Sequence, residues 1–227
     1  MKKTLLIIAC AVLSLTASAQ RASSSSSSFF STEKAEGGIE FGIRAGMNLA
    51  NASASDENGV SISPGNRTAF HIGVTADIPL MQSLYVQTGL FFQNKGHKYK
   101  EDEYTETSKP MYLEIPILAS YRYDFSDALQ LQINAGPYFG YGIGGKIKAE
   151  WDDDDSYYEV DFFGDGDDNY GANRFNCGLQ FGAGLTFSNH YYLGFAYQLG
   201  LSNVIKTNDD YDNVKDRNWM ISLGYNF

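Results

Sequence analysis

Residues 38–49 read GIEFGIRAGMNL, and this stretch alternates strictly between two kinds of side chain. The odd-numbered positions, from Ile39 to Leu49, are apolar, and the even-numbered positions are glycine, polar or charged. A period of two is typical of a β-strand, because successive side chains point to opposite faces. The stretch therefore predicts a strand with one purely apolar face.

Seven further stretches repeat this alternation as far as the C-terminus. Their apolar parity carries no charged residue, whereas the other parity is rich in glycine and in Gln, Asn, Ser, Thr, Tyr and charged residues. The pattern predicts an all-β fold of eight strands. Beyond the first strand, these cover residues 70–78, 84–93, 113–123, 129–143, 175–187, 191–201 and 219–227.

The volume of a barrel decides which face points outward. The interior of an eight-stranded barrel is only just wide enough for its own side chains. The large apolar residues of eight strands do not fit there, whereas glycines with scattered polar residues do. The apolar face must therefore point outward, and lipid is the solvent that accepts it. We predict an eight-stranded antiparallel up-and-down transmembrane β-barrel over residues 38–227, with a filled lumen.

The connections between the predicted strands alternate between short and long. Bacterial outer-membrane barrels have short periplasmic turns and long extracellular loops. The alternation therefore predicts an outer-membrane location with both termini in the periplasm. Short connections lie at 79–83, 124–128 and 188–190, and long ones at 50–67, 94–111, 144–174 and 202–218. Pro116 interrupts one strand, and we expect a β-bulge there because proline lacks the N–H that a ladder needs.

The N-terminal residues are typical of an exported protein. Residues 1–19 combine Lys2 and Lys3 with an apolar run and a small-residue cleavage site, which predicts a signal peptide. The alternative is a lipoprotein anchored through Cys10. Residues 20–37 include a run of six serines from Ser23 to Ser28, and such a segment is predicted to be a flexible tether.

The net charge and the C-terminal residue limit the classes of partner that we expect for this chain. The formal net charge is −10 and the pI is about 4.7, which argues against a nucleic-acid partner because little in the chain would neutralise phosphates. Phe227 ends the chain on the apolar parity. It resembles the terminal aromatic residue of outer-membrane strands, which implies recognition by the barrel-insertion machinery. The expected partners are thus outer-membrane lipid and that machinery.

One stretch of the chain resembles a known family. Residues 112–117, YLEIPI, are similar to an element of the outer-membrane β-barrel domain of Bacteroidetes bacteria, the family that includes the PorT-like proteins. Further similarities are FGIRAG at 41–46, QNKG at 93–96, GPY at 136–138 and GAG at 182–184. The resemblance covers about residues 38–227 and implies a small barrel of unassigned function. Its PorT-like members serve the type IX secretion system.

Charged residues on the lumen parity form the first candidate site. Charges inside a filled barrel must be paired, because an unpaired buried charge is costly. We expect a structural network that links Glu114 and Glu40 with Arg44 and Arg122, and the alternative is a proton or ion path. The candidate residues are Glu40, Arg44, His71, Asp77, Glu114 and Arg122. No lumen serine is evident beside His71, so we expect no enzymatic activity and no cofactor.

An acidic stretch forms the second candidate site. Residues 150–168 carry many carboxylates and no basic residue. One interpretation is a solvated, self-repelling loop. A second is a weak Ca²⁺ site, and a third is a docking face for a surface partner on the loop 144–174, whose aromatics favour binding. The candidate Ca²⁺ ligands are Asp152, Asp153, Asp154, Asp155, Asp165, Asp167 and Asp168.

The sequence thus predicts a small outer-membrane barrel with a structural or surface-interaction role and long acidic extracellular loops. The alternative is an accessory component of a secretion or envelope-assembly machine, as the PorT-like resemblance implies. A narrow diffusion pore is a third interpretation.

Overall fold

The computed structural model describes residues 38–55, 61–62, 65–101, 104–151, 157–164, 171–205 and 213–227. The predicted signal peptide and tether lie outside these residues. Within the described residues, one antiparallel sheet contains all the strands. The strands are β1 (Glu40–Ser55), β2 (Ser61–Ile62), β3 (Arg67–Met81), β4 (Leu84–Asn94), β5 (Lys98–Glu101), β6 (Tyr104–Ser126), β7 (Leu129–Trp151), β8 (Tyr157–Asp161), β9 (Phe175–Phe187), β10 (Tyr191–Gly200) and β11 (Asn213–Asn226).

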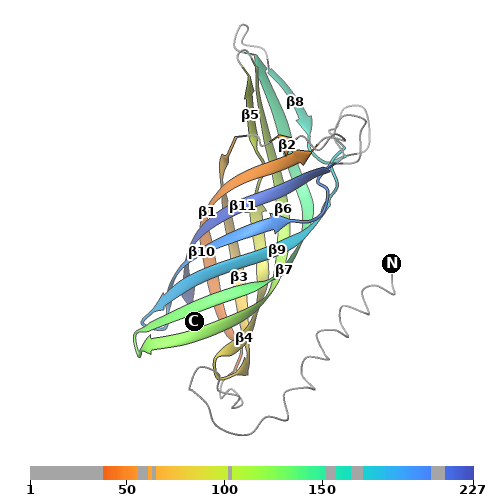
Figure 1. Cartoon of the computed structure of the whole chain (residues 1–227). Coiled ribbons are helices and arrows are strands. Elements are labelled where there is room, and N and C mark those ends of the chain that lie inside the picture. The colour runs from red at the N-terminus through yellow and green to blue at the C-terminus, as the bar shows by residue number, and fades with distance from the viewer. Residues whose placement is uncertain are drawn as a thin grey trace, which may run out of the picture.

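Eight of these strands close into a barrel (Figure 1). The ring runs β1–β3–β4–β6–β7–β9–β10–β11 and back to β1. Ile43 of β1 lies opposite Val74 of β3 on one side and opposite Tyr225 of β11 on the other. The predicted eight-stranded antiparallel barrel is therefore confirmed, and β2, β5 and β8 are short strands outside the ring.

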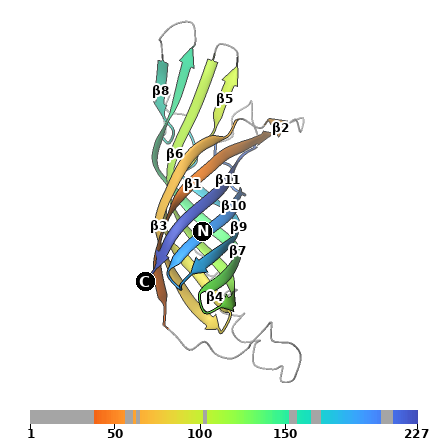
Figure 2. The same cartoon turned by 90° about the vertical axis from the view of Figure 1, so that its left-hand side faces the viewer.

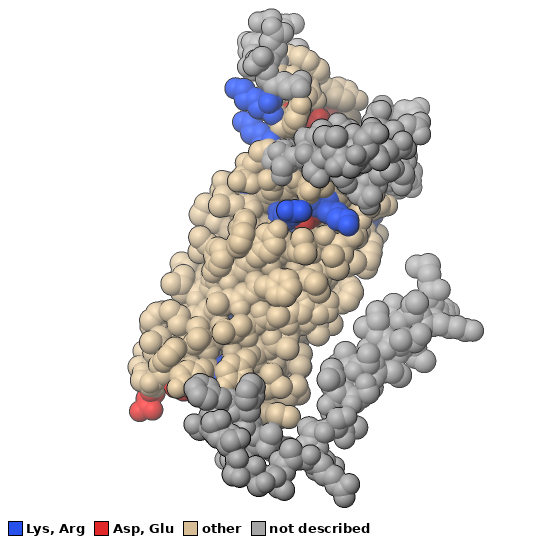
Figure 3. Space-filling model, viewed as in Figure 1, with Lys and Arg blue, Asp and Glu red and all other residues tan. Residues whose placement is uncertain are grey.

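The two faces of the barrel wall have the predicted orientation. Ile43 is 48% exposed, whereas its neighbour Arg44 is only 4% exposed. On the face that Figure 3 shows, the uncharged outer surface forms a broad tan area over the barrel wall. An apolar exterior with a polar interior is the reverse of a soluble protein, and a lipid environment requires this arrangement. Separately, the described residues contain no helix long and apolar enough to cross a bilayer.

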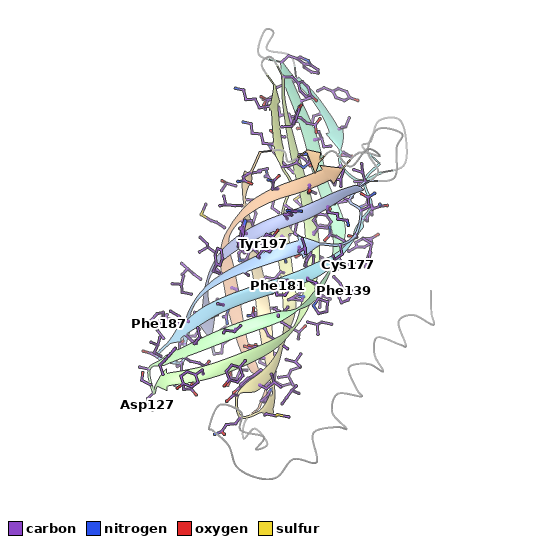
Figure 4. The ribbon with its side chains drawn as sticks, viewed as in Figure 1. Asp127, Phe139, Cys177, Phe181, Phe187 and Tyr197 are labelled. Carbon is purple, nitrogen blue, oxygen red and sulfur yellow. The ribbon has the colours of Figure 1, made fainter. Side chains whose placement is uncertain are left out.

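Short turns gather at one end of the barrel. The β9–β10 turn uses Ser188 and Asn189 at φ of 49° and 63°, the backbone of a type I′ hairpin turn. Figure 4 places Asp127, in the β6–β7 turn, at the same end as Phe187. The C-terminus lies there as well (Figure 1). Because short turns face the periplasm in outer-membrane barrels, we name this the periplasmic end and the opposite one the extracellular end.

The long connections differ from the prediction, which treated them as loops. Strands β6 and β7 each continue for 23 residues, about twice the length that crosses a membrane. Their outer halves pair with each other and with β5 and β8. The result is a four-stranded extracellular sheet, in the order β5–β6–β7–β8, which stands above the barrel (Figure 2).

The bulge expected at Pro116 is absent. One constant register joins β6 to both neighbours across this position, with Thr88 opposite Ile117 and Pro116 opposite Tyr138. The Thr88 hydroxyl donates to the Pro116 carbonyl at 2.8 Å, so a side chain satisfies this backbone acceptor. The register shifts instead between Met111 and Tyr112, where the extracellular sheet begins.

Glycines on the lumen parity make room for aromatic rings. A Cβ atom built on Gly194 would lie 2.2 Å from the Tyr192 hydroxyl, and one built on Gly184 would lie 2.4 Å from the same ring. Phe163 covers Gly142 in the same way, with a Cβ-to-ring distance of 2.3 Å. The glycines on the lumen side of the strands therefore leave the space that the lumenal aromatic rings occupy.

Candidate functional site

The periplasmic charge layer of the lumen is centred on Arg122. Its guanidinium contacts Glu40 at 2.7 Å and Asp77 at 2.6 Å. The same group lies 4.0 Å above the Tyr85 ring, and Gln87 donates to the second Asp77 oxygen at 2.8 Å. A vestibule of about 290 Å³ opens from this layer to the periplasm. Two carboxylates thus neutralise the arginine, and little charge is left for an anionic ligand.

Five of the six predicted lumen residues are buried in the lumen, whereas the Glu40 side chain is 48% exposed at its periplasmic opening. The six do not form the single expected network. Arg44 contacts no carboxylate among the described residues and instead lies 3.9 Å above the Tyr192 ring. Glu114 pairs with Lys95 at 2.5 Å, and both side chains are 1% exposed. Lys95 was missed because it follows the predicted strand, yet it shares the lumen parity of Gln93, and that parity was the available signal.

Lys95 and Glu114 close the extracellular end of the lumen. The Lys95 ammonium lies 4.5 Å above the Tyr138 ring and 5.6 Å from the Tyr112 ring. A second buried carboxylate, Asp216, accepts a hydrogen bond from the side-chain amide of Asn176 at 2.9 Å. Above this layer lies an apolar cluster that covers the mouth of the barrel. Its buried members are Ala52, Tyr112, Ile147, Phe162, Phe163, Ala172, Val204, Ile205 and Val214.

His71 lies between Asn48 and Ser222, in an arrangement that resembles a hydrolase triad. Its Nδ1 is 2.6 Å from Asn48 Oδ1, and its Nε2 is 2.8 Å from Ser222 Oγ. The Asn48 amide nitrogen donates to Gln93, so Asn48 Oδ1 accepts from His71 Nδ1 and leaves Nε2 to accept the Ser222 proton. Ser222 is not among the residues predicted from the sequence. It lies on the lumen parity opposite Gly46, and Gly46 in turn lies opposite His71 on β3.

The surroundings of Ser222 do not suit an acyl substrate. His71 is 1% exposed. Ser222 borders a central cavity of about 40 Å³, which extends between Arg44 and Glu114. A water needs roughly 10–15 Å³ of such space, so the cavity has room for a few waters but not for an ester with its leaving group. The arrangement satisfies three polar side chains inside the barrel wall, which is the role that buried polar groups require.

The seven predicted Ca²⁺ ligands, Asp152–Asp155, Asp165, Asp167 and Asp168, lie outside the described residues. The Ca²⁺ site therefore stays a prediction. Elsewhere in the described part of the chain, no group of three or more His, Cys, Asp and Glu side chains is placed to hold a metal ion.

The extracellular sheet has one charged face, which we call the lysine face. Pairing across the strands places five lysines on it: Lys98, Lys100, Lys109, Lys146 and Lys148. Glu150, Glu159 and Asp161 share the face. Hydrogen bonds to Glu159 and Glu150 raise the pKa of Lys146 and of Lys148, so both stay protonated. His97, just before β5, adds no charge at neutral pH because burial lowers its pKa to about 4.

Exposed aromatic side chains mark the hairpin of β7 and β8. Trp151 is 44% exposed, Tyr157 66% and Tyr158 55%. They lie beyond the membrane-spanning part of β7, so lipid does not cover them. Trp151 packs at 5.6 Å from the Tyr104 ring of β6, which anchors the base of this aromatic group.

A closed eight-stranded barrel with an apolar exterior and a filled polar lumen defines a small outer-membrane β-barrel protein, and the outer membrane is its location. The chain belongs to the family described as outer membrane protein beta-barrel domain, whose model matches residues 18–206. No curated protein matches the chain.

Solved structures of small barrels are similar to the chain at low identity. The neisserial surface protein NspA is 13% identical over 84% of this chain and 100% of its own, with a TM-score of 0.46. Ail of Yersinia pestis, in complex with a heparin analogue, is 17% identical over 84% and 99%, with a TM-score of 0.40. The outer membrane enzyme PagL is 16% identical over 79% and 98%, with a TM-score of 0.42.

Proposed function

We propose that this protein is a non-enzymatic surface-interaction barrel, which anchors a rigid extracellular sheet and presents it to a partner outside the cell. The observation that carries the proposal is the continuity of β6 and β7. Each strand runs unbroken from the periplasmic turn through the membrane into the sheet. A ligand-binding hairpin held in this way loses little conformational freedom on binding.

The lumen supports a role outside the barrel and not through it. The buried Lys95–Glu114 pair and the apolar cluster above it fill the extracellular mouth. The central cavity of about 40 Å³ has room for a few waters. The hydrogen-bonded Ser222–His71–Asn48 group is enclosed in the same lumen, which argues against hydrolysis of lipid or polymer.

The closed lumen predicts that the barrel does not conduct ions. Because Lys95 and Glu114 are each 1% exposed beneath an apolar cap, we expect no steady single-channel conductance from the full chain in planar bilayers. The recording is made on protein whose gel mobility shifts on boiling, so that only folded barrels are counted. A stable conducting state with a fixed unit size would contradict the proposal and restore the diffusion pore.

The exposed aromatics give the test of partner binding. We expect a chain with Trp151→Ser, Tyr157→Ser and Tyr158→Ser to fold normally but to bind its partner at least about thirtyfold more weakly, since exposed Trp and Tyr side chains are the usual hot spots of interfaces. The measurement applies the barrel in nanodiscs to arrays of glycans and extracellular proteins. Tyr191→Ser is the control, because Tyr191 is similarly exposed (63%) at the periplasmic end.

Two outcomes would contradict this proposal. One is a set of bound ligands that the triple variant retains in full. The other is an array on which neither chain binds, together with a deletion strain that fails to export cargo. That second outcome would favour the accessory role in secretion that the PorT-like resemblance implies.

A further inference from the structure

The lysine face brings five lysines together, and only Lys146 and Lys148 form ion pairs with described residues. Lys109 and Lys146 lie directly opposite each other on β6 and β7, and Lys98 is the diagonal neighbour of Lys109 through its partner Thr107. Like charges directly opposite on one face of a sheet destabilise it. Lys146 pairs with Glu159 at 2.5 Å, but Lys98, Lys100 and Lys109 form no ion pair with any described residue.

Protection of a sheet edge does not explain this arrangement. Lysines on an edge strand prevent pairing with other chains, and Lys98 and Lys100 on β5 fit that purpose. Lys109 and Lys146 do not, because β6 and β7 are the two central strands of the extracellular sheet and pair with neighbours on both sides. Glu159 and Asp161 compensate Lys146 on its β8 side, whereas Lys109 pairs with no described carboxylate. An anion beside Lys109 would therefore relieve the repulsion between the two lysines.

The height of the lysines above the membrane indicates where that anion is. Leu113 on β6 and Ile143 on β7 are exposed apolar residues of the lipid belt, at 39% and 46%. Lys109 precedes Leu113 by four positions and Lys146 follows Ile143 by three. At about 3.3 Å per residue along strands tilted by about 40°, both positions lie roughly 8–10 Å beyond these apolar residues, and a lysine side chain that bends toward the membrane brings its ammonium several ångströms lower. That is the level of lipid headgroups, which add several ångströms on each side of the bilayer core.

Among the described residues, the exposed basic side chains lie on this side of the barrel. Every described Lys and Arg that is not buried lies at the extracellular end, while the exposed charges of the periplasmic end are acidic (Figure 3). The basic residues are Arg67, Lys98, Lys100, Lys109, Lys146, Lys148, Arg174, Lys215 and Arg217, and the periplasmic acids are Glu40, Asp124 and Asp127. Within the described ranges, the exposed cations of this acidic chain therefore lie at the extracellular end of the barrel.

We propose that the lysine face binds phosphate groups on the headgroups of outer-leaflet lipids. Lysine is a compact point charge that suits phosphate oxygens, and several lysines on a flat sheet match a headgroup with more than one phosphate. This proposal is independent of the partner proposed for the aromatic hairpin, because the lysines near the membrane and the aromatics at the tip can be changed separately.

The test measures lipid binding by native mass spectrometry. The full chain is refolded in detergent and titrated with diphosphoryl lipid A or with the same lipid after its phosphates are removed. We expect the phosphorylated lipid to bind at least tenfold more tightly. Lys98→Gln with Lys109→Gln should weaken its binding about thirtyfold, since each lysine near an anionic surface contributes about fivefold in affinity.

Two controls separate local contact from overall charge. Lys98→Arg with Lys109→Arg keeps the charge and should retain binding within a fewfold. Lys215→Gln with Arg217→Gln removes two positive charges from β11, away from the sheet, and should also bind normally. Equal loss in the β11 variant, or full binding by the Lys98→Gln and Lys109→Gln variant, would overturn the proposal. Binding of inorganic phosphate as tight as that of lipid A, lost in the same variant, would show that free phosphate is the ligand and would overturn the lipid assignment.

Discussion

Replacing Lys95 with methionine is expected to lower the free energy of unfolding by about 3–5 kcal/mol, the usual cost of removing one partner from a buried ion pair. The ammonium is the cation that Glu114 contacts, at 2.5 Å, and both groups are 1% exposed. Without it, Glu114 and the nearby buried Asp216 would be two carboxylates in an enclosed lumen. The measurement is reversible unfolding in urea of barrels refolded into lipid vesicles.

The extracellular sheet offers a matched control for this experiment. Lys146 and Glu159 are also 2.5 Å apart, but their side chains are 57% and 37% exposed. Water solvates both partners, so Lys146→Met should leave the unfolding midpoint unchanged. A double variant, Lys95→Met with Glu114→Met, should recover much of the lost stability because no unpaired charge stays at that position. Equal effects of Lys95→Met and Lys146→Met would contradict the buried-pair argument.

The barrel could be predicted from the sequence because lipid imposes a strict rule on it. Each membrane-spanning strand must expose an apolar side chain at every second position, and a stretch such as 38–49 shows this directly. The volume of an eight-stranded lumen then decided the orientation of both faces. Exposures of 48% for Ile43 and 4% for Arg44 match that argument.

The extracellular sheet could not be predicted because the requirement for an apolar side chain at every second position ends at the membrane surface. Both faces of β5 and β8 meet water, so polar residues occupy both parities and the alternation disappears. The register shift between Met111 and Tyr112 also breaks the pattern at the point where the sheet begins. The same limit concealed Lys95, which lies one residue beyond β4 and still points into the lumen.

Contacts inside the lumen depend on which strands become neighbours. The sequence of a single strand does not reveal its neighbours. Ser222 and His71 are 151 positions apart, and they meet only because β11 closes the ring against β1. The lysine face could not be predicted from the net charge for a related reason. Net charge is an average over the chain, whereas the lysines are gathered on one face of one sheet.

Replacing Gly194 with valine is expected to destabilise the barrel by about 3 kcal/mol, at the upper end of the cost of overpacking. A Cβ atom there would lie 2.2 Å from the Tyr192 hydroxyl. The ring has no other place to go, because it also lies against Gly184 and beneath the Arg44 guanidinium at 3.9 Å. Urea unfolding in vesicles and the yield of the boiling-sensitive gel form both measure the effect.

Gly144→Val is the matched control, since a Cβ atom at Gly144 would meet only the Met111 methyl at 3.5 Å, an ordinary contact. The decisive comparison is Gly194→Val combined with Tyr192→Ala. If the ring is what excludes a side chain at Gly194, the double variant should lose about 1–3 kcal/mol less than the sum of the two single variants. Strictly additive losses would mean that the glycine serves the backbone alone. Coupling would instead show that the aromatic rings of the lumen leave no space for a side chain at the glycines beneath them. This would explain why a filled lumen and a glycine-rich lumen parity occur together in this chain.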